Sequence, residues 1–328
     1  NGAYRALEEA KAEGKIGHIG ATAHGLESFA RLIREYEDKI ETIMFPYNIV
    51  ENQGAELMKE CREKNIGFIA MKPMAGGNLD DTKLALRYIL KAAGKDTVLV
   101  IPACCNSVIQ GVYPYMLHTV PVYNIAFAAA AACASGMSEA LRAKGEKTNV
   151  IVYAGDGGTA DIGIQALSGA LERGEDFLYI CYDNEAYGNT GMQRSGATPL
   201  GAITTTTPNG KRVVKKDLDR IIEAHNLPYQ ATACASYPAD IYNKVKKALS
   251  IPGPKFIHIL APCPPGWRTP SEKTVEIGKM AVKSGIWVLW EKEYDKLTIS
   301  APSRAAMKKP MPVIDYLKAQ GRFKKVDE

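Results

Sequence analysis

The chain has 328 residues and a formal net charge of +5, with 46% hydrophobic and 23% charged residues. A single hydrophobic core rarely serves so long a chain, so two globular parts of unequal size are expected, and a disordered or fibrous protein is excluded. No nucleic-acid motif occurs, nor any basic segment interleaved with aromatic residues, so DNA and RNA are not expected as partners.

The first ninety or so residues alternate amphipathic helices with short apolar strands. Helices are predicted at 4–13, 26–36 and 55–64, and strands at 16–22, 43–47 and 67–72. Polar residues, Gly or Pro end each strand, as is typical of a parallel sheet covered by helices. This repeat is the unit of a (β/α) barrel.

Two segments of this part, Gly14–Thr22 and Gly67–Gly77, resemble the later strands of aldo-keto reductases. His24, Asn48 and Lys72 follow strands where that family holds its nicotinamide cofactor. The early strands that carry the family's catalytic residues have no counterpart in this sequence, and a closed barrel needs all its strands. Structural or vestigial roles are therefore favoured over NADPH binding for these three residues.

The pattern then changes to that of a different α/β domain, so the chain is divided into 1–82 and 83–328. Strands are predicted at 97–101, 149–154, 177–182 and 255–260, and helices at 126–144, 160–173, 215–225 and 239–249. Such alternation predicts a doubly wound parallel sheet. The predicted fold is thus α/β, with a partial (β/α) barrel preceding a doubly wound domain.

One stretch, His118–Met137, contains no Asp, Glu, Lys or Arg over about the length of a membrane-spanning helix. Pro121 and Asn124 interrupt it, and Ala, which dominates the rest, contributes little to membrane insertion. A buried, Ala-rich helix packed under a sheet is predicted, and no membrane association is expected.

The most informative segment is a hydrophobic strand that runs into Gly155-Asp156-Gly157-Gly158 and then into a helix. Glycine lets the backbone approach a ligand closely, and a helix N-terminus attracts phosphate groups. Alone, such a segment is more often a tight turn. Here the next strand ends at Asp183-Asn184-Glu185, and the carboxyl ends of neighbouring parallel strands share one edge of a sheet. Asp156 and Asn184 are therefore expected to reach one Mg²⁺ bound to a diphosphate.

Three segments, Gly155–Gly174, Tyr182–Gly191 and Thr198–Pro208, resemble the thiamine-diphosphate-binding β subunits of 2-oxoacid:ferredoxin oxidoreductases of the pyruvate synthase type. The resemblance runs from about residue 84 to the end. It implies three Mg²⁺ ligands, namely Asp156, Asn184 and the carbonyl group of Ala186. It places further residues beside the cofactor, namely Gly155, Gly157, Gly158, Tyr187, Asn189 and Thr190.

In that family, thiamine diphosphate attacks the keto carbon of a 2-oxoacid and CO₂ leaves. Electrons then pass through iron–sulfur clusters to ferredoxin, and the acyl group passes to coenzyme A. The resemblance implies this oxidative decarboxylation here, with pyruvate as the first expected substrate. It also implies partners, namely an α subunit that supplies the carboxylate activating the cofactor and ferredoxin-like γ and δ subunits or domains. The chain alone is expected to be inactive.

Seven cysteines are scattered along the chain with no secretory signal at its start, which favours a reducing cytoplasm. A [4Fe–4S] cluster uses four thiolates, commonly beginning with a Cys-x-x-Cys pair, and no such pair occurs. By the resemblance, Cys105 and Cys263 match the third and fourth cluster ligands, while reductase-like sequence occupies the segment of the first two. An empty or defective cluster is expected. Cys133, Cys181 and Cys234 are expected to be buried apolar residues.

Two other interpretations stay open, an NADP-dependent aldo-keto reductase fragment and a non-catalytic chimera. Two basic segments, Lys211–Lys216 and Arg322–Lys325, are expected to be solvent-exposed surface rather than a docking patch for an acidic partner.

Overall fold

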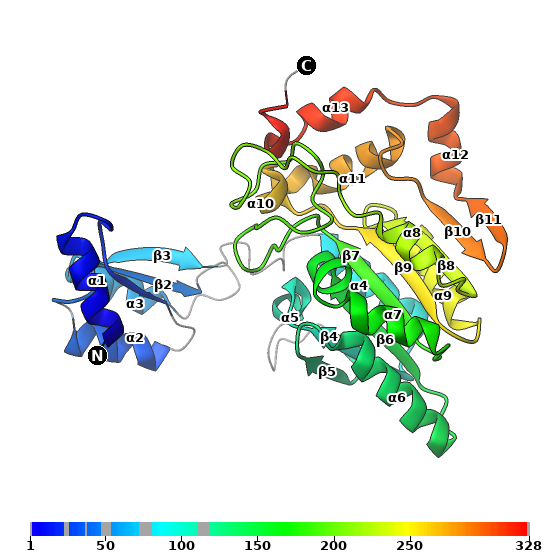
Figure 1. Cartoon of the computed structure of the whole chain (residues 1–328), viewed down its shortest axis with the longest axis horizontal. Coiled ribbons are helices and arrows are strands. Elements are labelled where there is room, and N and C mark those ends of the chain that lie inside the picture. The colour runs from blue at the N-terminus through cyan, green and yellow to red at the C-terminus, as the bar shows by residue number, and fades with distance from the viewer. Residues whose placement is uncertain are drawn as a thin grey trace. The chain divides into compact units, whose positions relative to one another are not determined.

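The computed structural model describes residues 2–22, 26–36, 38–46, 54–71, 81–110 and 118–326. The chain forms two compact units, Asn1–Gly76 and Gly77–Glu328 (Figure 1). The division of the chain into 1–82 and 83–328 remains a prediction.

In the first unit, parallel strands form a sheet in the order β1-β2-β3. The elements in chain order are α1 (Gly2–Ala12), β1 (Gly20–Thr22), α2 (Leu26–Glu35), β2 (Thr42–Pro46), α3 (Ala55–Glu63) and β3 (Gly67–Met71). Phe29 of α2 packs edge-on against Phe45 of β2, with ring centroids 5.6 Å apart, inside a small apolar core. The predicted helix and strand alternation is present, although β1 is shorter than expected.

Three residues predicted to follow strands of this unit, His24, Asn48 and Lys72, lie outside the described residues. Their structural or vestigial roles therefore remain predictions.

The second unit is built on an eight-stranded sheet in the order β11-β10-β8-β9-β7-β6-β4-β5 (Figure 1). The strands are β4 (Thr97–Pro102), β5 (Val122–Ile125), β6 (Asn149–Gly155), β7 (Leu178–Asp183), β8 (Tyr229–Cys234), β9 (Lys255–Leu260), β10 (Trp290–Glu293) and β11 (Lys296–Ile299). Strands β4 to β9 are parallel, whereas β10 and β11 add an antiparallel hairpin at one edge. The predicted α/β fold with a parallel sheet is confirmed, and the hairpin was not foreseen.

Helices cover both faces of this sheet, with α4 and α9 on one face and α6 and α7 on the other. The helices of this unit are α4 (Asp81–Ala93), α5 (Cys105–Ile109), α6 (Ala130–Lys144), α7 (Ile164–Glu172), α8 (Leu218–Glu223), α9 (Pro238–Leu249), α10 (Pro264–Trp267), α11 (Thr274–Lys283), α12 (Ala301–Lys308) and α13 (Val313–Lys318). In β7, Ile180 and Tyr182 pack in the core on the side of α4 and α9, whereas Tyr179 and Cys181 pack in the core on the side of α6 and α7. Because both faces are buried, the strand is apolar throughout instead of alternating.

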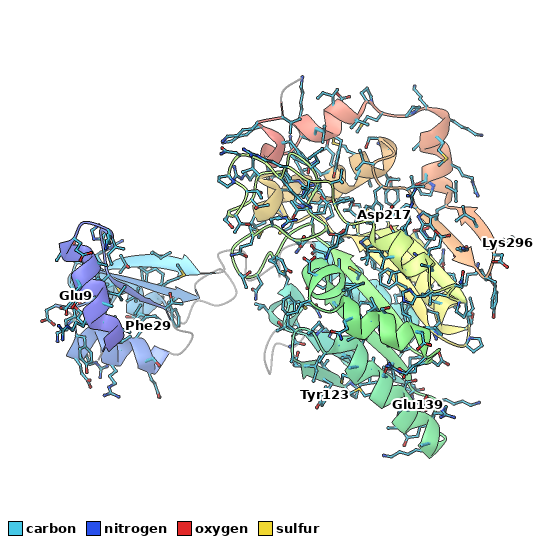
Figure 2. The ribbon with its side chains drawn as sticks, viewed as in Figure 1. Glu9, Phe29, Tyr123, Glu139, Asp217 and Lys296 are labelled. Atoms are coloured by element: carbon cyan, nitrogen blue, oxygen red, sulfur yellow. The ribbon has the colours of Figure 1, made fainter. Side chains whose placement is uncertain are left out.

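The Ala-rich stretch forms less helix than predicted. Residues Val122–Ile125 make the edge strand β5, where Tyr123 is 49% exposed (Figure 2), and α6 begins only at Ala130. From there on the prediction holds, because Ala131 and Ala134 pack under the sheet. Cys133 was expected to be buried but is only half-buried, because it lies at the border of the helix face that packs under the sheet. Cys181 and Cys234 are buried, as predicted.

Two basic residues predicted to be solvent-exposed are buried instead. Lys211 is 3% exposed, and its ammonium group donates to the carbonyl oxygens of Gly196 at 3.1 Å and Thr198 at 2.5 Å. Arg322 is 2% exposed and pairs with the buried carboxylate of Glu185. Both cations hold loops together, so neither segment is a simple solvated surface. No helix among the described residues is long and apolar enough to cross a membrane.

Candidate functional site

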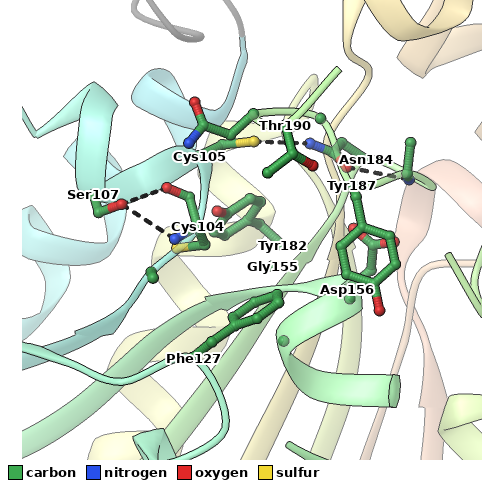
Figure 3. Close-up of a pocket in the computed structure, with 16 residues that line it drawn as sticks. Cys104, Cys105, Ser107, Phe127, Gly155, Asp156, Tyr182, Asn184, Tyr187 and Thr190 are labelled. Atoms are coloured by element: carbon green, nitrogen blue, oxygen red, sulfur yellow. Dashed lines mark hydrogen bonds between the residues drawn. The ribbon is translucent and has the colours of Figure 1, made fainter. Parts of the chain in front are cut away.

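A cavity of about 230 Å³ lies at the carboxyl ends of β4, β6 and β7 (Figure 3). The order in which the chain adds strands to the sheet reverses here. Strand β5 is added on one side of β4, whereas β6 and β7 are added on the other. Doubly wound sheets bind ligands at such a reversal. The cavity is lined by Ala103, Cys104, Cys105, Ser107, Phe127, Gly155, Asp156, Gly157, Gly158, Tyr182, Asn184, Ala186, Tyr187, Gly188, Asn189 and Thr190.

Every residue predicted from the sequence to hold Mg²⁺ or the diphosphate lines this cavity. The set comprises Gly155, Asp156, Gly157, Gly158, Asn184, Ala186, Tyr187, Asn189 and Thr190, and Cys105 lies among them. The register of β6 against β7, with Gly155 paired to Tyr182, brings the two motifs side by side. Their roles toward a ligand remain predictions.

Two aromatic rings close over the glycine loop. A Cβ atom at Gly157 would lie 2.2 Å from the Tyr187 ring, and one at Gly158 would lie 2.9 Å from the Phe127 ring. The two rings meet edge-on, with centroids 6.1 Å apart. Glycine is therefore required at both positions by packing inside the protein, in addition to the close approach of a ligand that the sequence suggested.

The helix that follows the glycine loop starts with a π-helical turn, Gly157–Asp161, and continues as α7 from Ile164. Thr159 Oγ1 donates to the carbonyl oxygen of Gly155 at 2.7 Å, which ties the turn to the end of β6. Single π-helical turns are frequent at functional sites. The positive end of this helical segment adjoins the cavity and favours an anion there.

Asp156 carries a buried carboxyl group, with 1% of the residue exposed. Ser195 Oγ donates a hydrogen bond to its Oδ2 atom at 2.5 Å. Burial raises the pKa of Asp156 well above its usual value, nearby Asp183 raises it further, and the Ser195 hydrogen bond opposes both. Because a divalent cation favours the ionised form of such a carboxyl group, Asp156 fits a Mg²⁺ ligand.

The turn after β7 presents Asn184 and Ala186 to the same cavity. Asp183 Oδ1 accepts a hydrogen bond from Glu185 N at 2.8 Å, and Asn184 Oδ1 accepts one from Ala186 N at 3.3 Å. Asn184 Nδ2 donates a weak bond to Cys105 Sγ at 3.6 Å (Figure 3). Glu185 has φ = +61°, a left-handed conformation that costs a residue other than glycine on the order of 1–3 kcal/mol. Such a turn persists only where its surroundings hold it.

Tyr187 is held over the cavity by a charged network. Its hydroxyl group donates to Asp161 Oδ2 at 2.9 Å, and Gly196 N donates to the same oxygen at 2.8 Å. Burial raises the pKa of Tyr187, and the Asp161 carboxylate raises it further. Burial alone would raise the pKa of Asp161, but Lys216, whose Nζ lies 2.7 Å from Oδ1, and these hydrogen bonds lower it. Tyr187 is therefore neutral and fixed in place.

The two cysteines matched to cluster ligands belong to no larger group of metal-ligating side chains among the described residues. Cys105 lines the cavity, whereas Cys263 is buried near Met192 and Gly266. Across the described ranges, no three or more His, Cys, Asp or Glu side chains are grouped to hold a metal ion. The described residues therefore do not fit a [4Fe–4S] cluster, which needs four ligands.

Several residues of this region were missed from the sequence. Phe127 and Cys104 line the cavity, Ser195 orients Asp156, and Trp267 Nε1 donates to the carbonyl oxygen of Asn184 at 2.9 Å. Cys104 stands next to Cys105, and Trp267 ends the motif that contains Cys263, so proximity to known motifs was the available signal. Phe127 and Ser195 had no local signal, because their contacts depend on how distant segments pack.

Two family models match the chain. The model described as "Thiamine pyrophosphate enzyme, C-terminal TPP binding domain" matches residues 105–259, which contain all the predicted Mg²⁺ and diphosphate residues. The aldo/keto reductase family model matches residues 2–85. The larger unit thus contains a thiamine pyrophosphate enzyme domain.

Similarity to individual curated proteins shows which family within this class the chain resembles. Ketoisovalerate oxidoreductase subunit VorB of Pyrococcus abyssi is 52% identical over 252 residues, which cover 74% of this chain and 80% of that protein. Pyruvate synthase subunit PorB of Methanocaldococcus jannaschii is 50% identical over 254 residues, which cover 74% of this chain and 84% of that protein. The solved 2-oxoglutarate:ferredoxin oxidoreductase from Magnetococcus marinus shares the fold, with a TM-score of 0.52 at 18% identity, over 76% of this chain and 88% of that chain.

The chain belongs to the family of 2-oxoacid:ferredoxin oxidoreductase β subunits. This membership confirms the resemblance drawn from the sequence, including the aldo-keto reductase segment at the N-terminus.

Proposed function

We propose that the cavity binds thiamine diphosphate with Mg²⁺ and that the chain serves in oxidative decarboxylation of a 2-oxoacid. The observation that carries this proposal is the meeting of Asp156, Asn184 and Ala186 in one cavity beside the glycine loop. A carboxylate, an amide oxygen and a main-chain carbonyl are hard oxygen ligands of the kind that Mg²⁺ combines with phosphate oxygens.

Each residue of the site has one task. Asp156, Asn184 and the Ala186 carbonyl hold Mg²⁺, and the backbone at Gly157 and Gly158 adjoins the diphosphate. Polar contacts from the loop at the cavity rim come from Asn189 and Thr190. Phe127 and Tyr187 cover the glycine loop and exclude water from it.

Bound thiamine diphosphate supplies the carbon nucleophile that attacks the keto group and takes up the electrons left when CO₂ departs. The chain contributes binding and orientation. No step is assigned to an iron–sulfur cluster in this chain, because the described residues do not fit one. Electron transfer to ferredoxin and acyl transfer to coenzyme A are therefore assigned to the assembly with an α subunit and ferredoxin-like γ and δ subunits or domains.

The proposed substrate is pyruvate or a branched 2-oxoacid such as ketoisovalerate. This choice is supported by the relatives named for these two substrates, which are 52% and 50% identical to the chain. A reductase activity is not proposed, because the described part of the first unit contributes three strands whereas a closed barrel of that family has eight.

The test is calorimetric titration of the full chain with thiamine diphosphate, with and without Mg²⁺. Wild type is expected to bind only with Mg²⁺, and Asp156→Ala is expected not to bind. Asp295→Ala, which removes an exposed carboxylate from the turn between β10 and β11, serves as the matched control and should bind like wild type.

Equal binding by wild type and Asp156→Ala would place the cofactor elsewhere. No binding by a folded wild-type chain would contradict the proposal and favour a non-catalytic chimera.

A further inference from the structure

We infer that Arg322 and Trp267 are positioning residues that hold the Asn184–Ala186 turn in the shape that binds Mg²⁺. The inference rests on the function proposed above. Neither residue lines the cavity, and both act through the turn that carries two of the three proposed Mg²⁺ ligands.

Arg322 forms a buried ion pair with Glu185, the middle residue of the turn. Arg322 Nη2 lies 2.5 Å from Glu185 Oε2, and each side chain is 3% exposed. Arg322 Nε also donates to Gln320 Oε1 at 2.9 Å, which fixes the direction of the guanidinium group. A second cation, Lys215, is farther away at 3.4 Å and is 36% exposed. Removing Arg322 would leave the buried Glu185 carboxylate with only the longer contact to Lys215.

Trp267 connects this ion pair to the neighbouring residue of the turn. The Arg322 guanidinium carbon lies 3.8 Å from the centroid of the Trp267 ring, and Trp267 Nε1 donates to the carbonyl oxygen of Asn184 at 2.9 Å. The cation therefore stacks on the same indole that fixes Asn184. Consecutive residues of the turn are anchored by one stacked pair.

The turn needs these anchors because its backbone is strained. Glu185 has φ = +61°, which its side chain disfavours, so the conformation must be imposed from outside. Thr198 Oγ1 adds a bond to the carbonyl oxygen of Glu185 at 2.6 Å, and Ile203 N donates to the carbonyl oxygen of Arg322 at 2.8 Å. The C-terminal segment and the loop from Thr198 to Ile203 thus clamp the turn from two directions.

The quantity to measure is the Mg²⁺ concentration that gives half-maximal binding of thiamine diphosphate by the full chain. Arg322→Gln is expected to raise it about tenfold or more, the usual effect of losing a group that orients metal ligands. Arg322→Lys keeps the charge and should recover part of the loss. Trp267→Phe keeps a ring but lacks the Nε1 donor, and should also raise the requirement.

Lys324→Ala is the matched control, because it removes an exposed cation from the same segment and should leave the Mg²⁺ requirement unchanged. A positioning role shifts the Mg²⁺ requirement at constant binding stoichiometry, whereas misfolding lowers the stoichiometry.

A wild-type Mg²⁺ requirement in both Arg322→Gln and Trp267→Phe would overturn the inference and leave the cofactor site intact. Failure of wild type itself to bind would remove the proposed function and this inference together. If Arg322→Gln does not fold, Trp267→Phe decides the question.

Discussion

At Gly157 the absence of a side chain leaves room for the Tyr187 ring, which an added Cβ would meet at 2.2 Å. Gly157→Ala is expected to displace that ring, weaken thiamine diphosphate binding and lower the free energy of unfolding by about 1–3 kcal/mol, the usual cost of overpacking. Urea unfolding and calorimetric titration measure the two effects.

Gly136 offers a matched control in the middle of α6, where an added Cβ meets nothing within 4 Å. Gly136→Ala is expected to stabilise the chain by about 0.5–1 kcal/mol, because alanine favours a helix over glycine. If both substitutions changed stability alike, the steric explanation for Gly157 would be wrong.

The raised pKa of Asp156 should make the stability of the folded chain depend on pH. Because the pKa is higher in the folded chain than the unfolded value of about 3.9, the protonated form favours folding. That stability is present at low pH and is lost as the pH rises from about 4 toward the folded-state pKa. In EDTA, the Tm of wild type relative to Asp156→Asn should therefore fall as the pH rises.

Mg²⁺ should oppose this loss of stability at higher pH, because the cation binds the ionised carboxylate of Asp156. The affinity of the chain for Mg²⁺ should therefore increase over the same pH window. A Tm difference between wild type and Asp156→Asn that stays constant with pH, measured by calorimetry in EDTA, would contradict the burial of a titrating Asp156.

Among the elements, α6 depends on small side chains for its approach to the sheet. Ala134 is fully buried between the helix and the sheet, whereas Ala132 on the same helix is exposed. Ala134→Leu is expected to lower the free energy of unfolding by about 1–3 kcal/mol, and Ala132→Leu to change it by less than about 0.5 kcal/mol. Denaturant unfolding of the two variants compares them directly, and equal losses would exclude close packing of α6.

Strands β4, β6, β7 and β9 could be predicted because each is a mainly apolar run bounded by polar residues, proline or glycine. Strand β8, Tyr229–Cys234, was missed because its sequence mixes Gln and Thr with small residues, although it is fully buried. Strand β5 was missed because an Ala-rich segment follows it closely. Local pattern thus identifies strands that are mainly apolar and fails where burial is imposed by neighbouring elements.

In the candidate site too, residues in local motifs could be predicted, whereas residues that act through distant contacts could not. The glycine loop and Asn184 carry local motifs, and the order of the strands was enough to predict that they meet. Arg322 and Ser195 were not predictable, because each acts on a residue far away along the chain, 137 positions away for Arg322 and Glu185. A basic segment in the sequence gives no sign that one of its cations is buried.

For the whole molecule, the two compact units have separate apolar cores, centred on Phe29 and Phe45 in the first and on the large sheet in the second. Two calorimetric unfolding transitions are therefore expected. Thiamine diphosphate with Mg²⁺ at about 100 times its Kd adds about 2.7 kcal/mol to the unit that binds it, or roughly 5–10 °C in Tm. Only the transition of the larger unit should move, and a single transition that shifts as one would contradict separate units.

The ion pair between Glu185 and Arg322 also sets an order of events during synthesis. Its two residues are 137 positions apart, so at about 5–20 residues per second the ribosome adds Arg322 roughly 7–27 s after Glu185. Through that interval the nascent chain contains the glycine loop and Asn184 but lacks the cation that pairs with Glu185. On the function proposed above, Mg²⁺ should therefore bind weakly until Arg322 has been added, and a chain that ends before Arg322 should require more Mg²⁺ to bind thiamine diphosphate.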